Sequence, residues 1–192
     1  MVEIFKAYLM ERADFSSEDL VRIDSFVSIK KLRKKQYLLQ EGDVWKYNAF
    51  ITHGCLRTYS VDEKGHEHNL SFSIENWWVG DRESLQTGQP SLYNIDAIED
   101  SEIALISKIN FDLLCQELPA FNAMVNSILQ KSFIASQKRI HSFISLSAEE
   151  KYLKFLAQYP QLVNRVPQGM IASYLGITPE TLSRVRKSSS RR

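Results

Sequence analysis

The stretch VPQGMIASYLGITPETLSRVRK, residues 166–187, predicts the fold of the C-terminal part of the chain. Its apolar residues fall into two runs with helical spacing, Ile171, Ala172 and Leu175 and then Leu182 and Val185. Gly176 lies between the runs, where a sharp turn needs a residue that tolerates a positive φ angle. The stretch therefore predicts two short helices joined by a tight turn.

The second helix has a clear start signal. Thr178 is placed as its N-cap and Pro179 as its first residue, where the missing N–H would be unpaired in any case. The polar residues that follow are predicted on the outer side of the helix: Glu180, Thr181, Ser183, Arg184 and Lys187. Such a face is typical of the recognition helix of a helix-turn-helix, which enters the major groove of double-stranded DNA.

The outer side chains suit two kinds of DNA contact. Arg184 can donate two hydrogen bonds to guanine, and Glu180 can accept one from cytosine. Phosphate contacts, which set the register, suit Thr178, Thr181, Arg186 and Lys187. The predicted DNA-contacting set is Thr178, Pro179, Glu180, Thr181, Ser183, Arg184, Arg186 and Lys187. The alternative is a helical hairpin whose charged face is only solvated.

Charge is distributed unevenly along the chain. The 192 residues carry 24 Lys and Arg and 23 Asp and Glu, a net charge of +1. Counted by segment, residues 1–110 carry −5, residues 111–146 carry +1 and residues 147–192 carry +5. A basic end behind an acidic front favours a polyanion-binding segment joined to a sensing or scaffolding one.

The composition is that of a globular protein, with 44% hydrophobic and 24% charged residues. Cys55 and Cys115 lie far apart without metal-ligand spacing, which favours a reducing compartment and argues against a cysteine-held cluster. Residues 1–15 contain no long apolar run, so neither a signal peptide nor a membrane span is expected. We expect a cytoplasmic protein with no membrane partner.

Residues 25–107 are typical of β-structure. Short β-branched and aromatic runs alternate with turn signals, which favours a sandwich or barrel. Residues 55–61 and 66–74 flank a turn and predict a hairpin. Residues 1–24 predict two short helices, the second capped by Ser16 or Ser17.

After Ile109 the apolar spacing becomes helical, and a new helix can start at Pro119. A helix of about 26 residues would be about 39 Å long, which favours a helix that spans domains or pairs with a partner chain. Polar residues interrupt its apolar stripe, so packing on the β-domain is the alternative. Ser147 is then placed to cap a helix whose buried face is predicted to hold Tyr152, Leu153, Phe155 and Leu156.

Residues 166–184 resemble the C-terminal helix-turn-helix of the cyclic-AMP receptor protein / fumarate and nitrate reductase regulator (Crp/Fnr) superfamily. Pro179 stands where several members have a base-reading arginine, so the resemblance carries over only Glu180 and Arg184 as base readers. The residues that match the family pattern are Val166, Ile171, Ala172, Leu175, Gly176, Thr178, Glu180, Thr181, Leu182 and Arg184.

The resemblance extends upstream, where residues 40–43, 51–57 and 79–81 look like the glycine turns of the family's β-roll. The long helix looks like its dimerisation helix. The resemblance implies an α+β fold and a Crp/Fnr-type transcription regulator that acts as a homodimer on a palindromic DNA site. The implied domains are a cyclic-nucleotide-binding-like β-roll (jelly roll) at 1–110, a long dimerisation helix at 111–146 and a helix-turn-helix domain at 147–192.

The sequence departs from the members that bind cyclic nucleotides, which have Gly-Glu followed about ten residues later by Arg-Ser or Arg-Thr. Here Gly80-Asp81 is followed by Ser91-Leu92. Cyclic AMP is therefore not the expected effector, and a different small molecule is left open, with Arg57 or Arg82 reaching its anionic group. The predicted effector-contacting residues are Gly80, Asp81, Arg82, Ser91, Leu92 and Tyr93.

Two other hypotheses stay open. His66 and His68 would share one face of a strand, with Glu75 as a third ligand, as in a metal-binding or small-ligand barrel of cupin type with a helical tail. Alternatively, the helix-turn-helix could bind another protein. No catalytic motif is found, so we expect neither an enzyme nor a metal site or cofactor.

Overall fold

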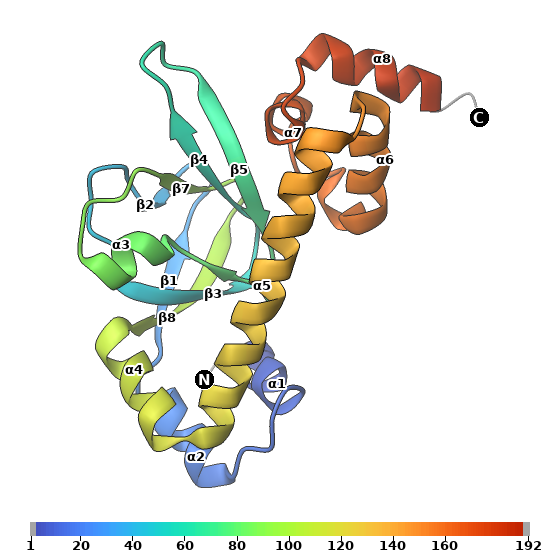
Figure 1. Ribbon diagram of the computed structural model, residues 1–192. Helices are drawn as coiled ribbons and strands as arrows, with labels where there is room; N and C mark the ends of the chain where they lie inside the picture. Colours follow the sequence, from blue (N-terminus) through green and yellow to red (C-terminus); the bar gives the residue numbers. More distant parts are fainter. Residues whose placement is uncertain (1–2, 190–192) are drawn as a thin grey trace.

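The computed structural model describes residues 3–189, and it confirms the mixed α+β class with a β-roll, a long helix and a helical C-terminal domain (Figure 1). The strands are β1 Ser28–Leu32, β2 Tyr37–Leu39, β3 Tyr47–His53, β4 Leu56–Val61, β5 Glu67–Ser73, β6 Trp78–Val79, β7 Asn94–Ala97 and β8 Ser101–Ser107. The helices are α1 Glu3–Met10, α2 Ser17–Asp24, α3 Arg82–Thr87, α4 Lys108–Glu117, α5 Pro119–Ser145, α6 Ala148–Gln158, the 3-10 turn η1 Pro160–Leu162, α7 Gln168–Leu175 and α8 Pro179–Ser189.

Two antiparallel four-stranded sheets form the β-roll, with strand orders β1-β8-β3-β6 and β2-β7-β4-β5. Apolar residues meet between the sheets, where Ile51, Ile95 and Ile103 are fully buried. The predicted hairpin is confirmed as β4–β5, in which Arg57 lies opposite Phe72. Burial of one face of each sheet fixes the register of the strands.

The two predicted N-terminal helices are confirmed, and Ser16 caps α2 in a capping box. With α4 and the start of α5 they cover the outer side of β3 and β8. Phe5, Phe50 and Phe121 are fully buried in this second core. It fixes the beginning of α5 to the β-roll.

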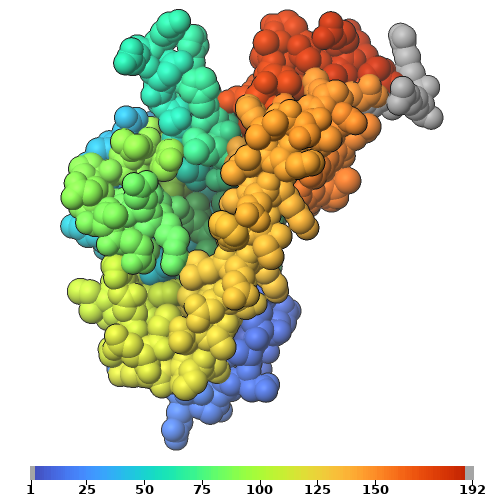
Figure 2. Space-filling view, in the orientation of Figure 1, coloured from blue at the N-terminus to red at the C-terminus, as the bar shows by residue number. Residues whose placement is uncertain are grey.

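The predicted long helix is confirmed as α5, which has 27 residues and begins at Pro119. Figure 2 shows it running from the β-roll to the C-terminal domain along the front of the molecule. Residues 130–141 are all exposed, and three apolar side chains stand out: Phe133, Ile140 and Ile144 are 64%, 60% and 77% exposed. We call these three residues the α5 stripe. Neither α5 nor any other helix within residues 3–189 has the long apolar run that crossing a membrane requires.

The predicted cap of α6 is confirmed, because Ser147 forms a capping box with Glu150. Tyr152 and Phe155 are buried as expected. The prediction for Leu153 is wrong, since it is 43% exposed. Consecutive residues of a helix point about 100° apart, so Leu153 turns away from the core that its neighbour Tyr152 enters.

The C-terminal helices share a third core with the β-roll, in which Cys55, Phe72 and Ile74 pack with Phe155 and Ile171. Leu182 and Val185 of α8 also belong to this core. The helix-turn-helix is therefore docked on sheet β2-β7-β4-β5 rather than joined to it only through α5.

Polar contacts reinforce this docking. Both terminal nitrogens of Arg165 donate to the carboxylate of Glu75 at 2.9 Å, and its Nε donates to Glu99 Oε1 at 3.1 Å. The Ser173 hydroxyl of α7 accepts from the N–H of Asn69 at 2.9 Å and donates to the carbonyl oxygen of Glu67 at 3.1 Å. These contacts orient α7, and through the tight turn they orient α8.

Candidate nucleic-acid interface

The turn between α7 and α8 has the predicted geometry. Gly176 adopts φ 66° and ψ 36°, in the left-handed region that favours glycine. The N–H of Ile177 donates to the carbonyl oxygen of Ala172 at 3.1 Å, which closes the end of α7. A Cβ at position 176 would overlap the ring of Phe143 on α5. Glycine therefore satisfies both the backbone angle and the close approach of α5.

The start of α8 is also as predicted. Thr178 Oγ1 accepts from the N–H of Thr181 at 3.2 Å, and Pro179 is the first helical residue. Leu182 and Val185 are buried. With the apolar side fixed inward, the opposite side of α8 faces solvent.

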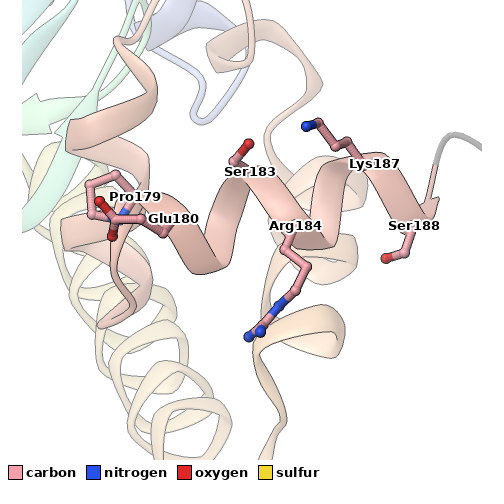
Figure 3. A pocket seen from close by; sticks show the side chains of 6 residues that line it. All are labelled: Pro179, Glu180, Ser183, Arg184, Lys187 and Ser188. Atoms are coloured by element: carbon pink, nitrogen blue, oxygen red, sulfur yellow. The ribbon is translucent and has the colours of Figure 1, made fainter.

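A shallow hollow of about 730 Å³ lies along this outer face, lined by Pro179, Glu180, Ser183, Arg184, Lys187 and Ser188. In Figure 3, Ser183 and Lys187 point to one side of α8, and Arg184 and Ser188 point to the other. Five of the eight predicted DNA-contacting residues line this hollow.

The other three predicted residues lie elsewhere. Thr178 and Thr181 contact each other at the start of α8, their hydroxyl oxygens 3.2 Å apart. Arg186 is exposed but does not line the hollow. Ser188 lines the hollow and is absent from the predicted set, although its position four residues after Arg184 was a signal for the same face.

The electrostatics of the face are mixed. Within residues 3–189, Arg184 and Lys187 have no carboxylate partner. Hydrogen bonds from its own backbone N–H and from Thr178 hold the pKa of Glu180 below its ordinary value. Glu180 is therefore an anionic acceptor at neutral pH, beside two cations that are available to phosphates or base edges.

The predicted effector-contacting residues meet at one turn of the β-roll, where most of their polar groups are already paired. Asp81 caps α3, accepting from the N–H groups of Glu83 and Ser84 at 2.9 and 3.2 Å. Its second oxygen accepts from the Ser91 hydroxyl at 2.7 Å. Arg82 and Leu92 are exposed and Tyr93 is half-buried. The assignment of this turn to an effector stays a prediction.

Gly80 in the same turn has φ 150°, and a Cβ there would collide with the indole of Trp45. Its role in the structure is therefore to allow a close approach to the core of the β-roll.

The hypothesis that Arg57 reaches an anionic ligand is wrong for this structure. Its guanidinium donates to both oxygens of Asp96 at 2.8 and 3.0 Å and also contacts Glu67. Although burial alone disfavours the charged form, these two carboxylates raise the pKa of Arg57 above its ordinary value. The arginine is charged, but its donors are occupied within the β4–β5–β7 sheet.

His66 and His68 do not meet Glu75. His66 Nδ1 and His68 Nε2 lie 3.2 and 3.1 Å from one oxygen of Asp62, whereas Glu75 pairs with Arg165. In the part of the chain that the structure describes, no group of three or more His, Cys, Asp or Glu residues is arranged to hold a metal ion.

Known proteins resemble this chain in sequence and in fold. Residues 29–117 match the model of the cyclic nucleotide-binding domain. The regulatory protein HlyX of Actinobacillus pleuropneumoniae is 25% identical over 185 residues, which is 88% of this chain and 75% of HlyX. The transcriptional activator protein anr of Pseudomonas aeruginosa is 27% identical over 184 residues, which is 88% of this chain and 73% of that protein.

Solved structures share the fold at lower identity. FixK2 from Bradyrhizobium japonicum aligns with a TM-score of 0.73 at 16% identity, covering 84% of this chain and 83% of FixK2. The c-di-GMP responsive global regulator CLP of Xanthomonas campestris aligns with a TM-score of 0.73 at 14% identity, covering 92% of each chain. The domain match and the named regulators support a regulator of the Crp/Fnr type, and the solved structures share the fold of this chain.

Proposed function

We propose that the protein is a homodimeric transcription regulator that binds double-stranded DNA through α8 and works in the cytoplasm, where its DNA is found. The observation that carries the proposal is the outer face of α8, on which Glu180, Arg184 and Lys187 are exposed while Leu182 and Val185 are buried. A helix presented in this way fits the major groove with its first turns toward the base edges.

Individual side chains have distinct proposed roles. Arg184 donates two hydrogen bonds to a guanine, and Glu180 accepts one from a cytosine amino group. Ser183 and Lys187 extend from the other side of the helix toward phosphates. Thr178, Thr181 and Arg186 contact the sugar-phosphate backbone of the DNA near the ends of α8. Pro179 fixes the first turn against the DNA.

Dimerisation follows from the α5 stripe. Phe133, Ile140 and Ile144 are more than half exposed on a helix that protrudes from the β-roll, and pairing of two α5 helices would remove all three from water. A twofold axis along the pair would present two α8 helices about 34 Å apart, at successive major grooves of a palindromic site.

Selection of bound duplexes from a random pool tests the proposal. The expected result is a site with twofold symmetry whose half-sites are about one helical turn apart. Bound sequences without symmetry, or no enrichment over random DNA, would contradict it. Gel filtration of the same protein is expected to give a dimer.

A charge placed on the stripe should separate the subunits. Ile140→Lys is expected to convert the dimer into a monomer and to weaken operator binding by about 100-fold, because the two half-sites are then bound independently. Val21→Lys is the matched control, since Val21 is 71% exposed on α2. A dimeric Ile140→Lys protein would place the subunit interface elsewhere.

A further inference from the structure

A cleft of about 860 Å³ lies where the β-roll, α5 and the C-terminal helices meet. Its walls come from β5 and the following loop, from the second half of α5, and from α6 and α7. Figure 1 shows α5 passing beside β5 on its way to α6 and α7. The volume lies in the range of pockets that hold small organic ligands.

The cleft is strongly basic. Five cationic side chains line it, and no carboxylate is among the lining residues: the cations are Lys131, Lys138, Arg139, Lys151 and Lys154. None of the five forms an ion pair with a carboxylate of residues 3–189. Like charges gathered without counter-charges repel each other, so a bound anion would stabilise the arrangement.

Aromatic rings form another part of the wall. Trp77 and Tyr159 meet edge to face with ring centroids 5.9 Å apart, and Phe155 lies 5.7 Å from Tyr174. The guanidinium of Arg139 stacks 4.3 Å over the Tyr174 ring and joins the basic and aromatic sides. Flat apolar surface next to positive charge is the environment that suits an aromatic anion.

The cleft and the α5 stripe are on different sides of α5. At 3.6 residues per turn, Phe133, Ile140 and Ile144 fall within about 40° of one another around the helix axis. By the same count, Lys131, Lys138 and Ser142 of the cleft fall roughly on the opposite side. Ser136 and Phe143, which also line the cleft, fall about 60° and 80° from the centre of the stripe, so pairing of two α5 helices leaves open the side of the cleft that holds Lys131 and Lys138.

We propose that this cleft is an effector site for a small organic anion that carries an aromatic ring and at least two negative charges. It is distinct from the Gly80–Tyr93 turn, none of whose residues line it. The inference deepens the proposed function, because a ligand that contacts the β-roll, α5 and α7 at once stabilises the orientation of α8 that the structure shows. A ligand shifts an equilibrium between orientations only through such a difference in contacts.

The experiment uses the full chain and trinitrophenyl-ATP, a fluorescent aromatic polyanion. Saturable binding is expected, with energy transfer from the cleft tryptophans Trp77 and Trp78 to the probe. Lys131→Gln/Lys138→Gln is expected to weaken binding by about tenfold or more, through the loss of two charge-assisted contacts. Lys30→Gln/Lys31→Gln on the exposed strand β1 removes the same charge far from the cleft in sequence and is expected to bind normally.

Competition separates the two parts of the ligand. Inorganic triphosphate, which lacks the ring, and adenosine, which lacks the charge, should each displace the probe at least tenfold less well than ATP. Equal displacement by triphosphate would overturn the aromatic part of the proposal. No saturable binding of the probe up to about 1 mM would overturn the site. Equal affinity of the Lys131→Gln/Lys138→Gln and Lys30→Gln/Lys31→Gln variants for the probe would also overturn it.

Operator binding is measured on the same proteins with and without the probe. Retained operator binding with no probe binding overturns only the effector site. Failure of the unaltered chain to bind the operator, both with and without the probe, overturns the proposed function instead.

Discussion

The turn at Gly80–Asp81 and the outer face of α8 both hold polar residues that the sequence predicts to bind another molecule. The structure pairs the polar groups of the turn within the chain and leaves those of α8 exposed. Asp81 is buried and accepts three hydrogen bonds from within the chain. Arg184 and Lys187 extend into solvent with no carboxylate partner within residues 3–189. A polar group that is already paired contributes to folding, whereas an unpaired charge is available to another molecule.

The largest expected effect is on the paired side of this comparison. Asp81→Ala removes the cap of α3 and takes away the closer of the two acceptors of the buried Ser91 hydroxyl, leaving only the more distant carbonyl oxygen of Tyr93. We therefore expect a loss of about 3 kcal/mol in the free energy of unfolding. Urea unfolding measures it. The folded fraction should bind the operator normally.

The control for this change is Asp43→Ala, which alters an exposed aspartate. It should leave the free energy of unfolding within about 0.5 kcal/mol of the original value. Similar stability of both variants would show that the hydrogen bonds of Asp81 contribute little to the fold.

The second effect is on the unpaired side. Arg184→Ala should reduce discrimination at one base pair of the operator by about 2 kcal/mol, because a bidentate contact to guanine is lost. Its unfolding transition should not move, since the side chain is exposed. Equal losses on operator and random duplexes would remove Arg184 from the base readers.

Arg165, Glu75 and Glu99 form a cluster of paired charges, the Arg165 cluster, at the contact between the β-roll and the C-terminal domain. Removing Arg165 tests how much such pairing contributes to folding. Arg165→Ala should cost about 1–2 kcal/mol in the free energy of unfolding, because Glu75 and Glu99 lose their shared donor. Arg22→Ala is the matched control, since Arg22 pairs with Glu117 at an exposed site, where such a pair contributes little.

The same cluster predicts a pH dependence. Burial raises the pKa of Glu75, but hydrogen bonds from Arg165 and the Gly54 N–H outweigh it and leave the pKa below its ordinary value. The stabilisation is therefore present above the ordinary glutamate pKa of about 4.3 and is lost as pH falls through the lower folded value. Urea unfolding at a series of acidic pH values should show a smaller loss in Arg165→Ala than in the original chain.

The smallest effect belongs to the phosphate contacts. Lys187→Ala should weaken operator and random duplexes alike and reduce the slope of log affinity against log salt by about one unit. Titrations at several salt concentrations measure the slope. An unchanged slope would mean that Lys187 points away from the phosphates in the complex.

The features that could be predicted from the sequence are local ones. Gly176, Thr178 and Pro179 specify a turn and a helix start within a few residues, and the structure confirms both. Helix α3 was missed, although Asp81 at its N-cap was a usable signal.

The features that could not be predicted depend on contacts between distant residues. Asp96 pairs with Arg57 across neighbouring strands, and 39 residues separate them in sequence. Nothing in the local pattern around Arg57 distinguishes an occupied guanidinium from a free one. The basic cleft was missed for the same reason, because its cations come from α5 and α6 and converge only in the fold.

The contact between Gly176 and Phe143 has a consequence for how the two halves of the proposed dimer communicate. The ring of Phe143 lies where a side chain at position 176 would be, so the turn before α8 rests directly on α5. Any rotation of α5 about its own axis moves that ring and must displace the turn. In the proposed dimer, the rotational phase of the paired α5 helices then sets the distance between the two α8 helices, without a separate hinge.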